Sequence, residues 1–291
     1  MEPTLNPESG FFRLRLDFAY DGTQYYGWAR QPGHRTIQSE IEGALGSIFN
    51  FTPNVVTAGR TDAGVHATGA VAHVDVPDRE FDVDNLAYRI NRILDEDIRI
   101  KKVSRANPYF HARYSASARH YQYKLADASR ELSPLERLDI APWYRHIDLE
   151  ILNQASALLL GEHDFAAFCK FRKNATTFRN LTRFDWVRRE DGILIGSISA
   201  DAFCYNMVRN LVGGVASVAE GRFDTQWILS VLEGKIRVAE LNVFPSRGLT
   251  LVGVDYPPDD QLASQAAKVM STRTFTSESA VNDESGDSDE Q

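Results

Sequence analysis

The residues best suited to chemistry stand together in one segment, Gly59-Arg60-Thr61-Asp62-Ala63-Gly64-Val65-His66-Ala67. Glycines on both sides of Asp62 allow backbone conformations that other residues avoid, and they let a ligand come close. Arg60 can bind a phosphate or hold a carboxylate through two parallel hydrogen bonds. The carboxylate of an Asp-Ala-Gly sequence can instead accept backbone N–H groups in an ordinary turn. Taken alone, the segment leaves a catalytic Asp62 and a structural turn both open.

The sequence contains few candidate metal ligands at a suitable spacing. His66 follows Asp62 by four residues, but two ligands do not make a metal site, and no third ligand stands at a convincing spacing. The two cysteines, Cys169 and Cys204, form neither a disulfide framework nor a zinc-finger spacing. We therefore expect no metal, and we interpret both cysteines as small buried hydrophobic residues.

The composition is that of a soluble globular protein. The chain has 291 residues, of which 43% are hydrophobic and 11% aromatic, enough for one large core or two moderate ones. No apolar run reaches the roughly 18 residues that indicate a membrane-spanning helix. The first ten residues are polar and contain Pro3 and Pro7, unlike a secretion signal. We expect a flexible segment over residues 1–10, no membrane association and a cytoplasmic location.

The net charge of −8 argues at first against a polyanionic partner, because phosphate contacts supply most of the non-specific affinity for nucleic acid. However, residues 271–291 hold six acidic residues and only one basic residue, Arg273. The rest of the chain is therefore closer to neutral. Residues 259–291 also hold few large apolar side chains, so the sequence predicts a disordered acidic tail there.

Basic residues interleaved with Tyr and Phe occur in two stretches of the chain. One stretch holds Arg172, Lys173, Arg179 and Arg183, and the other holds Arg105, His111, Arg113, Arg119, His120 and Lys124. Such mixtures suit RNA, since guanidinium groups contact phosphates while aromatic rings stack on unpaired bases. Charged residues on the solvated face of a strand look the same, so composition alone does not decide between the two.

Hydrophobic periodicity predicts both strands and helices. Alternation over residues 13–20 indicates a half-buried strand that ends at the Asp21-Gly22 turn. Apolar residues at helical spacing after Thr36, a good N-cap, predict a helix over 37–48. The other predicted elements are strands over 55–58, 71–76, 98–103, 120–125, 182–189, 193–200 and 249–254, and helices over 83–93, 149–160 and 203–218.

These elements divide into two successive units that each combine strands with a pair of helices. We place the boundary so that residues 11–113 form the first half and residues 114–258 form the second, and an alternative boundary lies near Ala141-Pro142. Helices gathered on one face of a sheet leave the other face free, and a free face can bind RNA. The predicted class is therefore α+β, with RNA as a candidate partner.

Several segments in these elements resemble the tRNA pseudouridine synthase A (TruA) family. The segment around Asp62 resembles that family's catalytic loop. Other matching segments follow in the family's order, among them Tyr20-Asp21-Gly22-Thr23-Gln24-Tyr25-Tyr26-Gly27-Trp28, Phe110-His111-Ala112-Arg113-Tyr114, Gly161-Glu162-His163-Asp164-Phe165 and Met207-Val208-Arg209-Asn210. The resemblance extends from about residue 13 to 257 and favours a catalytic Asp62 over a structural turn.

The resemblance implies a pseudouridine synthase fold. In it, two ferredoxin-like or RRM-like halves with mainly antiparallel sheets carry helices on one face and form a central RNA-binding cleft. It also implies a homodimer whose two subunits hold tRNA together. A basic groove shared by two chains can coexist with an acidic total charge. Neither a cofactor nor a metal ion is implied.

The activity that the resemblance implies is the conversion of uridine to pseudouridine at positions 38, 39 and/or 40 of the tRNA anticodon stem-loop. Asp62 would be the catalytic carboxylate, and Arg209 would pair with it. Tyr121 would stack on the target base and take part in a late proton transfer from C5. The substrate-binding residues implied are Arg60, Thr61, His66, Asp21, Tyr25, Trp28, Arg113 and Arg119.

The chemical route stays open at this point. An aspartate can attack C6 of the base, attack C1′ of the sugar, or assist elimination through a glycal, and all three routes need a carboxylate in contact with the nucleoside. A tyrosine with the usual pKa of about 10 is mostly protonated at neutral pH. Tyr121 would therefore need a cationic neighbour or a water relay to act as a base.

Three other functions compete with this interpretation: a catalytically silent RNA-binding module, a synthase with another RNA target, and a metal-dependent hydrolase. The sequence also departs from the family's usual pattern at Ala29, Ala70, Asp95 and Phe178. None of these departures falls on the three expected catalytic positions. They leave details of substrate contact open rather than the chemistry.

Overall fold

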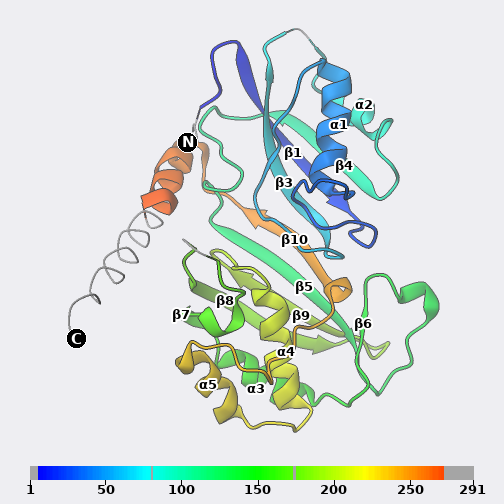
Figure 1. Cartoon of the computed structure of the whole chain (residues 1–291), viewed down its shortest axis with the longest axis vertical. Helices are drawn as coiled ribbons and strands as arrows, with labels where there is room; N and C mark the ends of the chain where they lie inside the picture. Colours follow the sequence, from blue (N-terminus) through cyan, green and yellow to red (C-terminus); the bar gives the residue numbers. More distant parts are fainter. Residues whose placement is uncertain (1–5, 80, 173–174, 272–291) are drawn as a thin grey trace, which may run out of the picture.

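In the part of the chain that the structure describes, ten strands form a single mixed sheet (Figure 1). The computed structural model describes residues 6–79, 81–172 and 175–271. The strands are β1 (Phe11–Tyr20), β2 (Val56–Thr57), β3 (His66–Pro77), β4 (Ile98–Arg105), β5 (Ala118–Ala126), β6 (Ala141–Pro142), β7 (Gly161–Asp164), β8 (Phe178–Arg188), β9 (Leu194–Ala200) and β10 (Leu249–Asp255). Their order across the sheet is β4-β1-β3-β10-β5-β9-β8-β7, with β2 paired to β3 and β6 paired to β5.

The helices α1 to α5 of the described residues fall into two groups. They are α1 (Ile37–Phe49), α2 (Leu86–Asn91), α3 (Leu149–Ala157), α4 (Met207–Ala219) and α5 (Thr225–Gly234), and residues 262–271 are also helical. Helices α1 and α2 lie with β1, β3 and β4, whereas α3, α4 and α5 lie with β7, β8 and β9 (Figure 1). Within the described ranges, no helix is long and apolar enough to cross a membrane. The mixed α+β class expected from the sequence is confirmed.

Helix α1 forms where the apolar spacing predicts it. The Thr36 hydroxyl accepts a hydrogen bond from the Ser39 N–H at 3.3 Å, and the Ser39 hydroxyl accepts one from the Thr36 N–H at 3.2 Å. Such caps satisfy N–H groups that have no partner inside the helix and contribute about 1 kcal/mol. Ile37, Ile41 and Leu45 are fully buried. The hydrogen bonds of the cap and the burial of the apolar face therefore both stabilise α1.

Strand β10 joins the two parts of the sheet. It runs parallel to β3, with Leu251 opposite Ala67, and antiparallel to β5, with Leu251 opposite Tyr121. The approach to β3 is close, because a Cβ added to Gly69 would lie 2.1 Å from the carbonyl oxygen of Val252. Only glycine fits at such a contact. Strand β10 thus holds both halves in one register.

Helix α4 is almost entirely buried, and Arg209 is its single residue that is not. Its two glycines allow this close packing. A Cβ on Gly213 would lie 1.9 Å from the carbonyl oxygen of Asn242, and a Cβ on Gly214 would lie 2.7 Å from Ile228 Cδ1. Neighbouring segments therefore rest directly on the helix backbone. This packing fixes the direction in which Arg209 leaves the helix.

Several boundaries differ from those expected from the sequence. The predicted helix over 203–218 begins only at Met207, because Asn206 has φ 65°, a left-handed conformation outside the helical region. The predicted helix over 83–93 covers only Leu86–Asn91. Strand β3 is longer than expected, and the short strands β6 and β7 give no periodic signal that would predict them.

Part of the predicted acidic tail is ordered. Residues 262–271 are helical, and Leu262 is buried in a small apolar cluster with Val71 and Phe110. This contact occurs across the fold and leaves no mark in the composition of the tail. The expectation of disorder from residue 259 is therefore wrong as far as residue 271. Residues 1–5 and 272–291, which belong to the expected flexible ends, lie outside the described residues.

Replacing Gly213 by alanine should lower the free energy of unfolding by about 1–3 kcal/mol, because the added Cβ collides with a carbonyl oxygen in a well-packed interior. Gly43 in α1 is exposed and has nothing within 4 Å of an added Cβ. Gly43→Ala should therefore raise the free energy of unfolding by about 0.5–1 kcal/mol. Urea unfolding of both variants measures the two changes, and changes of the same sign would contradict this account of α4.

Candidate active site

The loop that carries Asp62 lies between β2 and β3 and is fixed by an earlier segment of the chain. The Trp28 N–H donates to the Thr61 carbonyl at 3.0 Å, and the Thr61 hydroxyl is hydrogen-bonded to the Tyr20 phenol at 2.8 Å. Gly27 has φ +89°, and a Cβ there would lie 2.7 Å from the Thr61 carbonyl oxygen. Both observations require glycine at this position. The two segments therefore pack backbone against backbone, and the loop has little freedom.

Asp62 lies in a cavity of about 460 Å³ where the two parts of the sheet meet. One wall is formed by the Asp62 loop and β2, and the other by the segment before α4 and its first turn. A volume of this size is typical of sites for small ligands. The predicted site residues that line it are Asp62, Tyr121, Arg209, Arg60, Thr61, Trp28, Arg113 and Arg119. In residues 6–79, 81–172 and 175–271, no three His, Cys, Asp or Glu side chains are grouped to hold a metal ion.

Arg209 and Asp62 form an ion pair in this cavity. Arg209 Nη1 lies 3.8 Å from Asp62 Oδ2, and the two side chains are 19% and 17% exposed. Arg209 is held in place because its Nε donates to the Phe244 carbonyl at 2.6 Å. The expected pairing of the two residues is confirmed. The separation allows charge attraction without a short hydrogen bond, so the carboxylate oxygens remain available to a ligand.

Burial raises the pKa of Asp62 above its ordinary value. The positive charges of Arg209, Arg172 and Lys170 oppose this effect without cancelling it. Desolvation disfavours the negative form, whereas nearby cations favour it. The site therefore holds a carboxylate that has lost part of its water shell and that depends on neighbouring cations to stay ionised.

Tyr121, on β5, forms another wall of the cavity. Its side chain is buried, and its ring stands edge-on to Phe203, with centroids 5.2 Å apart and planes at 89°. Burial raises the pKa of the phenol, as does the charge of Asp62 to a smaller extent, while Arg119 opposes the shift. The hydroxyl is therefore protonated at neutral pH. No described residue hydrogen-bonds to it, so it is available to a ligand.

Arg119 lines the cavity, but its guanidinium is engaged with the main chain. Nη1 donates to the Asp201 carbonyl at 2.7 Å, and Nη2 donates to the carbonyls of Arg113 at 2.7 Å and Ala58 at 3.1 Å. The side chain is also buried. This geometry favours a structural clamp between three segments over the substrate contact expected from the sequence.

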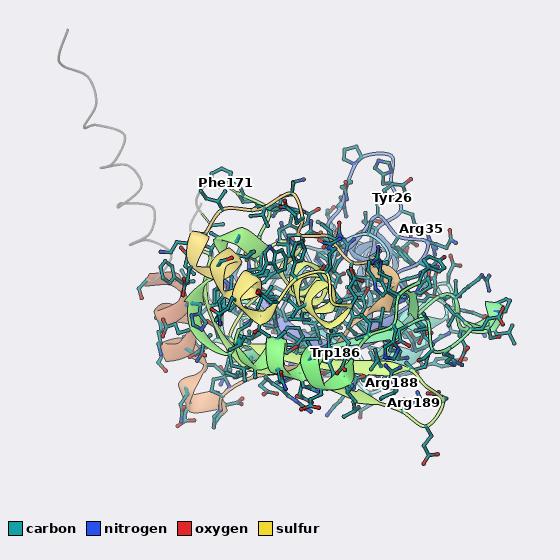
Figure 2. The ribbon with its side chains drawn as sticks, turned by 90° about the horizontal axis from the view of Figure 1, so that it is seen from below. Tyr26, Arg35, Phe171, Trp186, Arg188 and Arg189 are labelled. Atoms are coloured by element: carbon teal, nitrogen blue, oxygen red, sulfur yellow. A yellow bond between two sulfur atoms is a disulfide. The ribbon has the colours of Figure 1, made fainter. Side chains whose placement is uncertain are left out.

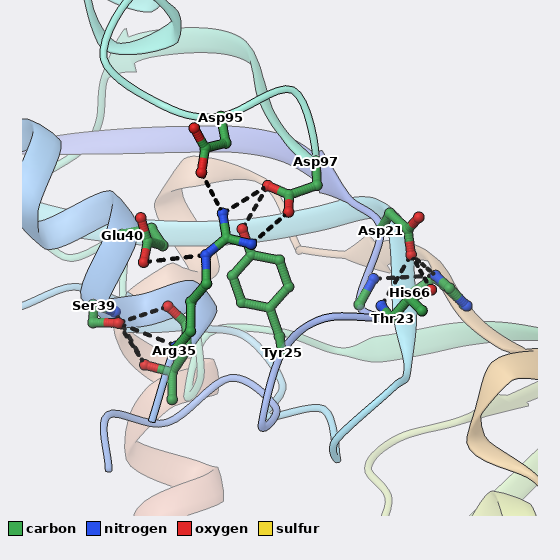
Figure 3. Close-up of polar contacts among 11 residues, drawn as sticks. Asp21, Thr23, Tyr25, Arg35, Ser39, Glu40, His66, Asp95 and Asp97 are labelled. Atoms are coloured by element: carbon green, nitrogen blue, oxygen red, sulfur yellow. Dashed lines mark hydrogen bonds and ion pairs between the residues drawn. The ribbon is translucent and has the colours of Figure 1, made fainter. Parts of the chain in front are cut away.

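Asp21, Tyr25 and His66 do not line the cavity, although the sequence predicts them as substrate-binding residues. Figure 3 shows the polar contacts that they make within the protein. The buried His66 ring accepts a hydrogen bond at Nδ1 from the Gly22 N–H at 3.1 Å, and Nδ1 lies 3.1 Å from Asp21 Oδ1. Its Nε2 donates to the Leu138 carbonyl at 2.9 Å. His66 therefore ties the turn after β1 to a loop of the second half.

Tyr25 belongs to an ion cluster around Arg35 (Figure 3). The Tyr25 hydroxyl donates to Asp97 Oδ1 at 2.6 Å, and the Arg35 guanidinium carbon lies 4.4 Å from the centroid of the Tyr25 ring. Arg35 also pairs with Asp97 and Asp95 at 2.7 Å each and with Glu40 at 3.5 Å. The cluster holds Tyr25, which belongs to the same segment as Gly27 and Trp28, the two residues that contact the Asp62 loop.

Three predicted residues at the cavity differ in the exposure and the protein contacts of their side chains. Arg60 is exposed, and no hydrogen bond or ion pair to another described residue holds its side chain. Trp28 is only 2% exposed and so contributes mainly to the core behind the cavity. The guanidinium of Arg113 lies 5.6 Å from the centroid of the Tyr114 ring. Arg60 is therefore the predicted side chain with the greatest freedom to meet a substrate.

The structure adds residues to the site that sequence reasoning did not assign to it. Phe203 and Tyr205 line the cavity, and so does Arg172. Arg172 and Lys170 lie 4.7 Å and 5.4 Å from the centroid of the Tyr205 ring. Arg172 is visible in the sequence as part of a basic stretch. The two aromatic residues are not, because the periodicity of α4 extends the predicted helix over them.

Cys169 and Cys204 are joined by a disulfide, with Cα atoms 5.8 Å apart. The expectation of two unpaired cysteines is therefore wrong, because their separation of 35 residues carries no signal for pairing. Cys204 lines the cavity between Phe203 and Tyr205. The Lys170 N–H also donates to the Tyr205 carbonyl at 2.9 Å. Both bonds fasten the Lys170 segment to the cavity wall.

Comparisons with known proteins agree along most of the chain. The model of a family described as tRNA pseudouridine synthase matches residues 18–115 and 155–257. The tRNA pseudouridine synthase A of Frankia casuarinae is 47% identical over 265 residues, which cover 91% of this chain and 96% of the relative. That of Cutibacterium acnes is 45% identical, covering 90% and 95%, and that of Streptomyces griseus is 44% identical, covering 92% and 96%. The chain therefore belongs to the tRNA pseudouridine synthase family.

Proposed function

We propose that this chain converts uridine to pseudouridine at positions 38, 39 and/or 40 of the tRNA anticodon stem-loop, with Asp62 as the catalytic carboxylate. Family membership establishes the coarser activity, which is the isomerisation of uridine in tRNA. The observation that carries the proposal is the position of Asp62. It is partly desolvated and paired with Arg209 in a cavity lined by both halves of the chain.

The reaction breaks the bond between N1 of uracil and C1′ of the ribose, turns the base, and joins C5 to C1′. It is an isomerisation and consumes no other reactant. Ionised Asp62 can attack C1′, attack C6, or remove a sugar proton on the route through a glycal. Each route requires the carboxylate to be ionised when the nucleoside arrives. Arg209 supports that state and orients the carboxylate.

Proton transfer completes the reaction, because C5 must lose its proton after the new carbon–carbon bond forms and N1 must gain one. Tyr121 is protonated at rest, since burial raises the pKa of its phenol. It can therefore serve as a relay, giving up its own proton as it accepts the one from C5. Its hydroxyl has no protein partner among the described residues, so this role disturbs no structural bond.

Arg60 is the residue that we propose contacts a phosphate next to the target. A uridine within a stem or stacked loop must leave the stack to reach a recessed carboxylate. A free guanidinium at the rim can hold the displaced backbone by charge-assisted hydrogen bonds. Arg113 lines the same cavity and is proposed as a second substrate contact.

The proposal includes the assembly and location that the resemblance implies. We propose a homodimer in the cytoplasm, with tRNA held by both subunits. The two parts of the sheet, one with α1 and α2 and the other with α3 and α4, are proposed to correspond to two ferredoxin-like halves around a central RNA-binding cleft. The cavity between them supports this interpretation.

Replacing Asp62 by Asn or Ala should lower pseudouridine formation at positions 38–40 by at least about 10³-fold, because each route needs the carboxylate. The assay is incubation with unmodified tRNA transcript and excess chelator, followed by site-resolved pseudouridine mapping. Asp185→Asn, which alters a side chain that is 44% exposed and does not line the cavity, is the control and should remain active. Wild-type protein that binds tRNA but forms no pseudouridine would instead indicate an RNA-binding module, and loss of wild-type activity on addition of chelator would indicate a metal-dependent enzyme.

The acid limb of the pH profile of kcat/KM should lie above the usual range for an aspartate, because burial raises the pKa of Asp62. Activity is lost as the pH falls through this pKa, since the protonated carboxyl is inactive. Arg209→Met removes a cation that lowers the pKa, so the limb should move to still higher pH. The exposed Arg183→Gln should leave it in place. An Arg209→Met limb that stays or moves to lower pH would refute the coupling.

Tyr121→Phe should lower kcat by about 10²-fold or more, because it removes the proton relay. The affinity for tRNA should change little, since the ring is kept and the hydroxyl has no described protein partner. Single-turnover kinetics and tRNA binding measured on the same preparation separate the two effects. A variant with normal kcat would show that the phenol is not in the proton path.

A further inference from the structure

We propose that two exposed aromatic side chains, Tyr26 and Phe171, form stacking sites for unpaired tRNA bases on either side of the catalytic cavity. This inference rests on the proposed function, because it takes tRNA as the molecule that enters the cavity between them. Tyr26 comes from the first half of the chain and Phe171 from the second. Figure 2 shows both side chains standing out at the same edge of the molecule.

Phe171 is placed beside the cavity but makes almost no contact with the protein. It is 87% exposed. Its neighbours Lys170 and Arg172 are anchored, because both lie against the Tyr205 ring and the Lys170 N–H is bonded to the Tyr205 carbonyl. Arg172 lines the cavity. The chain thus presents an unburied phenyl ring between two cations at the edge of the site.

Tyr26 is the corresponding ring on the first half. It is 55% exposed, and one side of it is covered by His34, with ring centroids 4.0 Å apart and planes at 27°. Its backbone is pinned, because the Tyr26 N–H donates to the Arg35 carbonyl at 3.0 Å and Gln31 Nε2 donates to the Tyr26 carbonyl at 2.9 Å. Gly27, the next residue, packs on the Asp62 loop. The backbone of Tyr26 is therefore held next to a residue that packs on the Asp62 loop, while more than half of the side chain remains exposed.

The charges around the cavity indicate a polyanion as the occupant. No carboxylate of the described residues lies within ion-pair distance of Arg60, Lys170 or Arg172, although other arginines and lysines of the chain form ion pairs. Cations without an ion-pair partner on both sides of the exposed Phe171 form a combination that binds unpaired nucleic acid, since the cations meet phosphates and the ring stacks on a base.

A second copy of this chain is the competing occupant for these rings. A symmetric dimer that paired this surface with itself would bring the same three cations of each copy towards each other. That repulsion disfavours self-association at this site. RNA supplies the opposite charge and the flat apolar partners at once.

The reaction itself leaves bases on which the two rings can stack. Extruding a uridine from its stack removes stacking from the bases beside it. Aromatic side chains outside the cavity can replace part of that lost contact on the flanking nucleotides. Because this contact is made before and during the chemical step alike, its loss should raise KM and leave kcat unchanged.

The test is to replace each ring and to measure tRNA binding and turnover separately. Tyr26→Ala and Phe171→Ala should each raise the Kd and KM for unmodified tRNA by about fivefold or more, the effect of losing one base–aromatic stack. The conservative variants Tyr26→Phe and Phe171→Tyr should bind as the wild type does. Tyr144→Ala removes an aromatic residue that is 89% exposed and does not line the cavity, and it is the matched control.

The Kd values are measured by fluorescence anisotropy in an Asp62→Asn background, so that they do not depend on catalysis. Failure of the proposed function, with no pseudouridine at positions 38–40, is therefore seen separately from failure of the stacking sites. Unchanged Kd for both alanine variants would overturn the inference, and so would a loss confined to kcat. Dissociation of a dimer by either alanine variant, seen by light scattering, would show that the rings cover a second copy instead.

Discussion

The pairing of β10 with both β3 and β5 is the contact on which the rest of this structure depends. Leu251 lies between Ala67 on one side and Tyr121 on the other. The Asp62 loop leads directly into β3, whereas Tyr121 is part of β5, so the register of β10 sets the distance between the two. At Gly69, β3 approaches the β10 backbone so closely that there is little room for the two strands to shift. The site is therefore a property of the joined sheet and of neither half alone.

The electrostatics of Asp62 follow from that position. A carboxylate at the junction of two halves loses water, and its negative form then needs compensation. Arg209 supplies this charge from α4. Because this helix is buried along nearly its whole length, the backbone of Arg209 is held in place. Lys170 and Arg172 add charge from a segment fastened by the disulfide and by the bond to Tyr205. The acidic group and its three cations thus come from separate parts of the chain that only the tertiary fold brings together.

Much of this arrangement could be predicted from the sequence, and the failures have physical causes. The α1 helix was predictable because its cap and its apolar face are both local signals. The pairing of Asp62 with Arg209 was expected from the family resemblance, whereas the apolar residues around Arg209 indicated only that this cation needs some partner. Asp21, Tyr25 and His66 were assigned to the substrate surface, yet they bind other parts of the protein, since a motif does not reveal in which direction a side chain points. The ordered residues after 259 and the disulfide depend on contacts between distant segments, which local patterns do not record.

The position of β10 late in the sequence has a consequence for the way the protein is made. Its parallel pairing joins Thr250 to His66, so the central contact of the sheet closes a very long loop of chain. Long-range pairing of this kind costs entropy before it yields stabilisation, and it is slow to form. During synthesis, the segment that carries Asp62 leaves the ribosome long before the strand that aligns it with Tyr121. The nascent chain therefore carries Asp62 without an assembled cavity until β10 is in place.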